Sequence, residues 1–127
     1  MDKEGGNIVE TKTSVVTKKE IQDVLLDMGV PENLIGSMYL THALELVLDN
    51  PRSMTKLVDG LYVDIGKRFN VKSTSVERCM RHAINATWKR GNVPYINTMF
   101  RYCLSPQKDV PTNSQFITRL YYYFTNE

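Results

Sequence analysis

The stretch from Thr74 to Gly91, TSVERCMRHAINATWKRG, constrains the fold most, because it predicts one long helix with two chemically different faces. One arc has the i, i+3, i+4 spacing of a helix that packs on a core; it holds Val76, Cys79, Met80, Ala83, Ile84 and Thr87. The opposite arc holds Thr74, Arg78, Arg81, Asn85 and Lys89. The sequence therefore predicts a helix that is buried on one side and cationic on the other.

Local signals predict both ends of this helix. Thr74 and Glu77 form a T-x-x-E pattern, in which each side chain accepts a backbone N–H of the first turn. Gly91 and Asn92 tolerate the left-handed backbone that often ends helices. We expect the helix to start with Thr74 as its cap and to stop at Gly91.

A shorter helix is predicted over residues 62–69, YVDIGKRF, with a four-residue connection over 70–73. Gly66 supplies a small residue where the two helices cross, and Asn70 accepts a left-handed turn conformation. Val71, Val76 and Cys79 are expected to fill the wedge between the helices. Two helices at a steep angle form a helix-turn-helix, whose second helix enters a DNA major groove.

The rest of the chain also predicts helices, and no segment shows strand alternation with hairpin turns. We expect an all-α domain of six or seven helices over residues 17–127, preceded by a disordered polar arm over residues 1–16. Capping boxes are predicted at Thr17 with Glu20 and at Thr112 with Gln115. The further helices are expected over residues 17–28, 33–48, 53–58 and 93–104 and from 112 onward.

Charge is concentrated on the predicted helix pair. Residues 67–90 hold seven Lys or Arg and one acid, whereas the rest of the chain holds nine basic and 13 acidic residues. Such asymmetry is an electrostatic footprint for phosphate. The two cysteines, Cys79 and Cys103, lack metal-site or disulfide-framework spacing, so we expect no metal and no cofactor. No signal peptide or membrane span is evident, so we expect a cytoplasmic protein.

Several runs of residues resemble one family. VERCMRHAINATWKRGN, with DIGKRFN before it, PTNSQFI after it and DMGVPENLIGSMYLTHAL near the start, is similar to the DNA-binding effector domains of the stage-zero sporulation protein A family of response regulators. The resemblance implies a six-helix transcription regulator that binds TGTCGAA-like boxes in double-stranded DNA at the nucleoid. It also makes the RNA polymerase sigma subunit a candidate partner. The family's phosphorylated receiver domain has no counterpart in these 127 residues.

The resemblance also implies roles for particular residues. Glu77, Arg78 and Arg81 match base-reading positions, and this suits their chemistry, because Arg pairs with guanine and Glu accepts from cytosine. Ser75 stands where the family pattern has Arg, which implies an altered contact, and residues 55–64 form a longer segment than the family's. The positions expected to bind phosphate are Lys67, Arg68, Thr74, Ser75, His82 and Lys89.

Plainer interpretations stay open. Arg78, Arg81 and Lys89 are also what a solvated helix face contains. The chain could instead be an interaction or decoy protein that pairs with a full-length regulator without binding DNA. The tyrosine-rich run over residues 121–124 exceeds what one core-facing stripe can bury, which makes it a candidate surface for self-association on tandem sites. We expect no enzyme, because Cys79 and His82 have no third residue to orient a catalytic pair.

Overall fold

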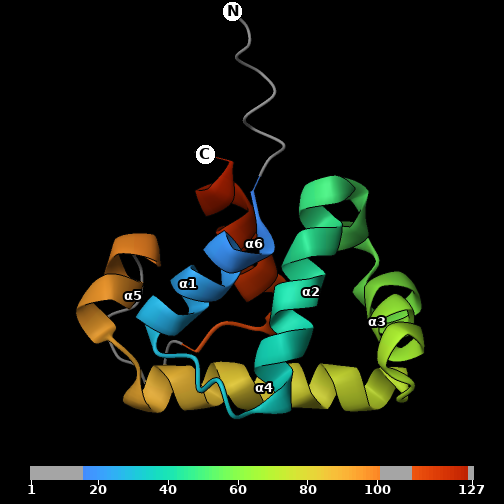
Figure 1. The fold of residues 1–127 in the computed structure, drawn as a ribbon, viewed down its shortest axis with the longest axis horizontal. Helices are drawn as coiled ribbons and strands as arrows, with labels where there is room; N and C mark the ends of the chain where they lie inside the picture. The colour runs from blue at the N-terminus through green and yellow to red at the C-terminus, as the bar shows by residue number, and fades with distance from the viewer. Residues whose placement is uncertain (1–15, 101–109, 126–127) are drawn as a thin grey trace, which may run out of the picture.

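The computed structural model describes residues 16–100 and 110–125 of the chain. The described residues form α-helices and two short helical turns and contain no strand, which confirms the all-α prediction (Figure 1). The elements in chain order are α1 (Lys18–Met28), α2 (Ile35–Asp49), the 3-10 turn η3 (Pro51–Thr55), the π-helical turn η4 (Leu57–Leu61), α3 (Tyr62–Phe69), α4 (Ser73–Arg90), α5 (Val93–Met99) and α6 (Asn113–Phe124). The predicted arm over residues 1–16 lies almost wholly outside the described part of the chain.

The long helix α4 forms one edge of the molecule, and the other described elements lie on a single side of it (Figure 1). Helices α2, α3 and α6 all pack against α4. With 18 residues, α4 is about 27 Å long. It therefore spans the domain and leaves one of its faces uncovered.

The core forms where α2, α4 and α6 meet. Leu40 and Leu44 of α2, Met80 of α4, and Phe116 and Leu120 of α6 are fully buried. Each such side chain contributes roughly 1.5–3 kcal/mol through its removal from water. The inner arc of α4 is thus the floor of the hydrophobic core, as its periodicity predicts.

Trp88 closes the core near the end of α4. Its ring is 1% exposed and meets Phe100 edge to face, with 5.0 Å between the ring centroids. It also meets Phe116 at 6.0 Å. Such aromatic contacts add roughly 0.5–1.5 kcal/mol beyond burial, so Trp88 has a packing role.

Local signals set the first and last helices. Thr17 and Glu20 form a reciprocal capping box at α1, and Thr112 and Gln115 form another at α6, as predicted. Each cap is worth about 1 kcal/mol. Residues 62–69 form α3 with the predicted bounds, and Asn70 ends it in the left-handed conformation at φ 59°.

The start of α4 differs from its prediction. The helix begins at Ser73, and Lys72 stands at the cap position, two residues before the predicted cap Thr74, without a side-chain cap bond. Lys72 has the extended backbone that a cap requires, whereas Thr74 is already helical, so it cannot cap. The connection from α3 is correspondingly three residues long. Glu77 is thereby freed from capping and forms an ion pair with Arg81.

The end of α4 also follows a different rule from the one predicted. Gly91 has φ −76° and ψ −175°, which is extended and not left-handed. A side chain there would overlap the carbonyl oxygen of Thr87 and would lie 2.6 Å from that of Met28. Close approach of the Thr87 and Met28 carbonyls, and not backbone handedness, therefore requires glycine.

Three further predictions need correction. Val71 is 38% exposed and Cys79 half-buried, so of the three wedge residues Val76 alone is fully buried. The helix predicted over 53–58 is replaced by η3 and η4, because Asn50 caps a new turn that begins at Pro51. The helix predicted over 93–104 ends at Met99, and residues 101–109 lie outside the described residues.

None of the helices in the described ranges is long and apolar enough to cross a membrane.

The crossing of α2 and α4 depends on one small residue. A Cβ at Gly36 would overlap the carbonyl oxygen of Cys79 and would lie 2.8 Å from its carbonyl carbon and 2.9 Å from Cβ of Ala83. These are mainly backbone atoms of α4, which cannot rotate away as a side chain can. Glycine at position 36 therefore sets how closely the two helices approach.

We expect Gly36→Ala to destabilise the fold by about 3 kcal/mol, because the new methyl group forces the two helices apart. Gly60→Ala is the control, since a Cβ there meets Lys56 Cβ at an ordinary 3.5 Å. Urea unfolding followed by circular dichroism measures both. If Gly36→Ala unfolds at the same urea concentration as wild type, the close-contact argument is wrong.

Candidate nucleic-acid interface

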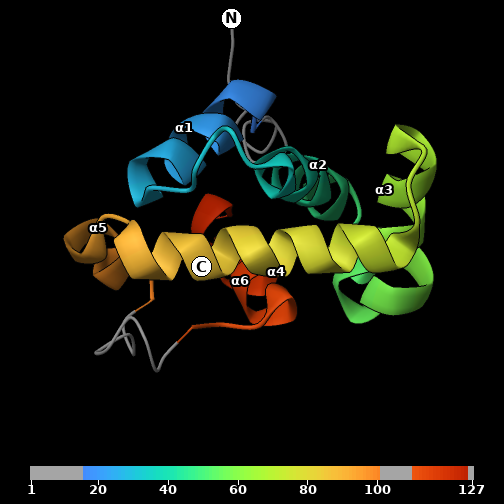
Figure 2. The ribbon, with the colours of Figure 1, turned by 90° about the horizontal axis from the view of Figure 1, so that it is seen from below.

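The outer face of α4, comprising Thr74, Arg78, Arg81, Asn85 and Lys89, is exposed along its whole length. Seen from below, α4 crosses in front of the other helices, and no described element covers it in that view (Figure 2). Val76, Met80 and Ile84 on the inner arc are at most 1% exposed. The core thus anchors the helix and leaves the outer face free to bind.

Glu77 and Arg81 form an ion pair at the edge of the outer face. The two side chains are 37% and 51% exposed, so the pair is worth at most about 1 kcal/mol. Arg78 donates a long hydrogen bond of 3.5 Å from Nη2 to Ser75 Oγ. Both guanidinium groups can therefore exchange these partners for another acceptor at small cost.

The residues predicted to contact phosphate lie around this face, with one exception. Lys67, at the end of α3, is exposed, as are Thr74, His82 and Lys89. Ser75 is half-buried. Lys89 lies 15 residues beyond Thr74, about 22 Å along the helix axis. Side chains at the two ends of α4 can therefore contact well-separated points on a bound partner.

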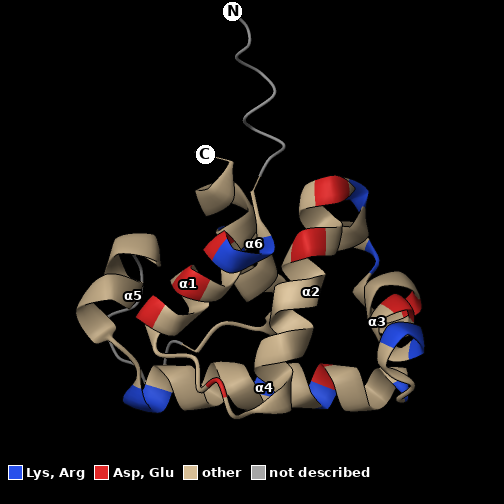
Figure 3. Ribbon diagram, in the orientation of Figure 1, with Lys and Arg blue, Asp and Glu red and all other residues tan. Residues whose placement is uncertain are grey.

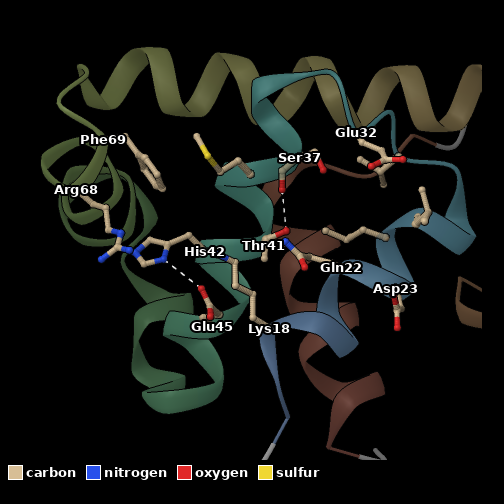
Figure 4. Close-up of a pocket in the computed structure, with 14 residues that line it drawn as sticks. Lys18, Gln22, Asp23, Glu32, Ser37, Thr41, His42, Glu45, Arg68 and Phe69 are labelled. Carbon is tan, nitrogen blue, oxygen red and sulfur yellow. Dashed lines mark hydrogen bonds and ion pairs between the residues drawn. The ribbon is translucent and has the colours of Figure 1, made fainter.

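The exception is Arg68, which faces the other side of α3. Its guanidinium lies 5.8 Å from the ring centroid of Phe69 and lines a cavity of about 510 Å³ between α1, α2 and α3. Figure 4 shows it beside His42, whose Nδ1 is 3.3 Å from Glu45 Oε1. Arg68 must change rotamer to reach a phosphate bound along α4.

Charged side chains are unevenly distributed over the molecule. Figure 3 shows Lys and Arg along α4 and on α3, whereas α1 carries both Lys and acids, and the far end of α2 carries Asp and Glu. The acids of α1, Glu20, Asp23 and Asp27, are exposed. The excess of basic over acidic residues is therefore concentrated over residues 67–90, which include α4.

A buried polar cluster lies behind the first turns of α4. Asn113 Nδ2 donates to the backbone carbonyl of Glu77 at 3.1 Å and to Tyr62 Oη at 3.0 Å. Burial raises the pKa of the Tyr62 phenol, the hydrogen bond from Asn113 lowers it, and the charges of Glu77 and Arg81 raise and lower it respectively. The cluster therefore joins α3, α4 and α6 directly behind the outer face.

Sequence reasoning missed this cluster. Tyr62 and Asn113 are 51 positions apart and belong to no shared motif or period. Asn113 follows the cap residue Thr112, where a polar residue is ordinarily solvent-exposed. The run PTNSQFI around Asn113 has no periodicity that predicts a buried asparagine, so no sequence pattern could have located the cluster.

The described residues offer little for other chemistry. They contain no group of three His, Cys, Asp or Glu side chains arranged to hold a metal ion. Cys79 is half-buried against the core, whereas His82 is exposed. The outer face of α4, which groups Arg78, Arg81 and Lys89, is therefore the candidate binding surface in the described part of the chain.

An all-α fold with a long, uncovered cationic helix defines a class of small helical domains that bind nucleic acid. Comparison with known families agrees: residues 21–124 match the family described as "Sporulation initiation factor Spo0A C terminal". The match covers most of the chain, and the protein belongs to this family of DNA-binding effector domains. The sequence resemblance is thereby confirmed, and the partner is double-stranded DNA.

Proposed function

We propose that this protein is a sequence-specific transcription regulator that reads a TGTCGAA-like box by placing α4 in the major groove. The observation that carries this proposal is the uncovered outer face of α4, where Arg78 and Arg81 lie one turn apart beside Glu77. In this arrangement α3, the turn at Asn70 and α4 act as a helix-turn-helix, with α3 crossing the DNA backbone.

The chemistry of the three side chains suits a mixed G and C box. Each Arg can bind O6 and N7 of a guanine with two parallel hydrogen bonds, and Glu77 can accept from N4 of a cytosine. The Glu77–Arg81 pair holds the two side chains next to each other at the edge of the outer face. Because that pair is solvent-exposed, its exchange for base contacts costs little.

Phosphate contacts would frame the base contacts. Lys67, Thr74 and His82 surround the first half of α4, and Lys89 lies at its far end. Arg68 joins them after its side chain swings out of the cavity beside His42. Ser75 is too short to reach as far as the arginine that the family pattern has there, so it contributes at most a local hydroxyl contact.

The biological setting follows from this role. A regulator of transcription works in the cytoplasm at the nucleoid, and it meets RNA polymerase there. We therefore propose the sigma subunit as a partner, and self-association on tandem boxes through the exposed tyrosines of α6. Tyr122 and Tyr123 are 40% and 39% exposed, enough to supply an aromatic contact between neighbouring domains.

Arg78→Ala and Arg81→Ala should each weaken binding to a box-containing duplex by roughly 1–3 kcal/mol, because each removes a bidentate base contact. Binding to a scrambled duplex should change much less. Lys19→Ala on α1, which removes the same charge from an exposed site away from α4, is the control. Fluorescence anisotropy with both duplexes measures the effect.

Equal losses on cognate and scrambled duplexes would refute base reading by these arginines. Binding of a full-length regulator, with no binding to either duplex, would favour the decoy interpretation instead.

Lys67→Ala should weaken binding to all sequences to a similar extent and keep the preference for the box, because a phosphate contact carries no sequence information. The slope of log affinity against log salt should become shallower by about one unit. His82→Ala should also weaken all sequences alike. Titrations at several salt concentrations test this, and an unchanged slope for Lys67→Ala would exclude its phosphate contact.

The isolated chain should bind one box weakly as a monomer and gain affinity on two tandem boxes through contacts between neighbouring domains. Tyr122→Ala should reduce that gain, because it removes exposed aromatic surface. Leu26→Ala, which trims a 51% exposed side chain on α1, is the matched control. Independent binding of wild type to the two boxes would remove the interface at α6.

A further inference from the structure

Asn113 differs from the other buried polar residues of the described part of the chain. Three polar residues are buried there, Thr41, Thr87 and Asn113. Both threonines donate to a carbonyl of their own helix, four residues back, at 2.9 and 2.7 Å. Asn113, which is 7% exposed, instead donates from α6 to α3 and to α4. Its amide is thus a tertiary connection, whereas each threonine hydroxyl makes a local one.

Stability alone does not account for an amide at this position. Asn113 Oδ1 is buried and has no hydrogen-bond partner among the described residues. A buried carbonyl group without a partner carries the cost of its lost hydration, and a leucine of the same branched shape would not. The two bonds that Nδ2 donates are what an apolar side chain could not supply.

The atom that Asn113 holds on α4 belongs to the turn that faces DNA in the proposed function. The Glu77 carbonyl has a second lone pair, so it can accept from Asn113 while it remains in the helix. One turn further along, Arg81 pairs with the Glu77 carboxylate. A bond to this carbonyl therefore acts on the backbone that carries both Glu77 and Arg81.

Apolar packing beneath α4 acts on the side of the helix opposite its outer face. Val76 and Met80 lie fully buried on the inner arc and hold that arc against the core. Bidentate base contacts require their groups within about 0.5 Å and 10–20° of the productive geometry. The hydrogen bond from Asn113 adds a directional restraint at the Glu77 carbonyl itself, beside the groups that must be placed.

We infer that Asn113 is a positioning residue for DNA reading: through its bonds to the Glu77 carbonyl and to Tyr62, it fixes the rotation of α4 and thereby the placement of Glu77 and Arg81. Asn113 touches no base itself. This inference deepens the proposed function and depends on it. It also gives a role to the run PTNSQFI, which lies outside the helix pair.

The test compares Asn113→Leu with wild type in the full chain, using a box-containing duplex and a scrambled one. Asn113→Leu should keep the stability of the fold and lower the ratio of cognate to scrambled affinity at least about fivefold. Affinity for the scrambled duplex should stay within about twofold, because side chains that bind phosphate tolerate a small rotation of α4 better than bidentate base contacts do, and they carry no sequence information. Ser114→Ala, an exposed neighbour in the same turn, is the control and should change neither quantity.

Two further variants cover the case in which leucine does not fit. Asn113→Ala removes the donor without added bulk and should lower the same affinity ratio. Tyr62→Phe removes one acceptor and keeps the ring, so that Asn113 still holds the Glu77 carbonyl; it should lower the ratio less than either change at 113. This ranking distinguishes positioning from a general loss of stability, which urea unfolding of each variant measures separately.

The outcomes separate this inference from the function on which it rests. If wild type binds both duplexes equally, the proposed base reading fails first. If wild type prefers the box and a folded Asn113 variant keeps the same preference, then Asn113 does not position α4 and the inference is overturned.

Discussion

The close crossing of α2 over α4 is the contact on which the rest of the structure depends. At Gly36 the backbone of α2 lies against the Cys79 carbonyl of α4, with no space for a methyl group. This contact brings the buried side chains of both helices into one core, to which Leu40 and Leu44 of α2 and Met80 and Ile84 of α4 belong. Because backbone atoms set the distance, small changes in side-chain packing elsewhere cannot compensate for a larger residue there.

Anchoring α4 from one side has a consequence for binding. Apolar residues on the inner arc supply the stability of the helix, so the outer face is not needed for folding and can carry like charges close together. Repulsion between Arg78, Arg81 and Lys89 is reduced because water screens exposed charges strongly. The same separation lets the outer face vary in sequence without loss of the fold.

Helix α6 contributes both to the hydrophobic core and to the placement of the outer face of α4. Phe116, Ile117 and Leu120 extend the core, whereas its first residue reaches across to the backbone of Glu77. A buried polar contact is a costly way to hold two helices together, but it is directional in a way that apolar packing is not. It connects the far end of the sequence to the turn of α4 that carries Glu77 and Arg81.

Local chemistry in the sequence determined much of the fold and half of the candidate site. The capping boxes at Thr17 and Thr112, the bounds of α3, the left-handed Asn70 and the two faces of α4 each depend on residues within one or two turns of each other. Such signals act through backbone conformation and side-chain period, and both are present in the sequence itself. The exposure of Arg78, Arg81 and Lys89 follows from the same periodicity.

The tertiary structure decided what depends on residues far apart in the chain. Gly91 is required in part by the Met28 carbonyl at the end of α1, which lies far from it in the sequence. Arg68 lies beside His42, and Asn113 meets Glu77 and Tyr62, because helices distant in sequence pack side by side. No periodicity in the sequence encodes these contacts. They form only when burial of the apolar arcs brings the helices together.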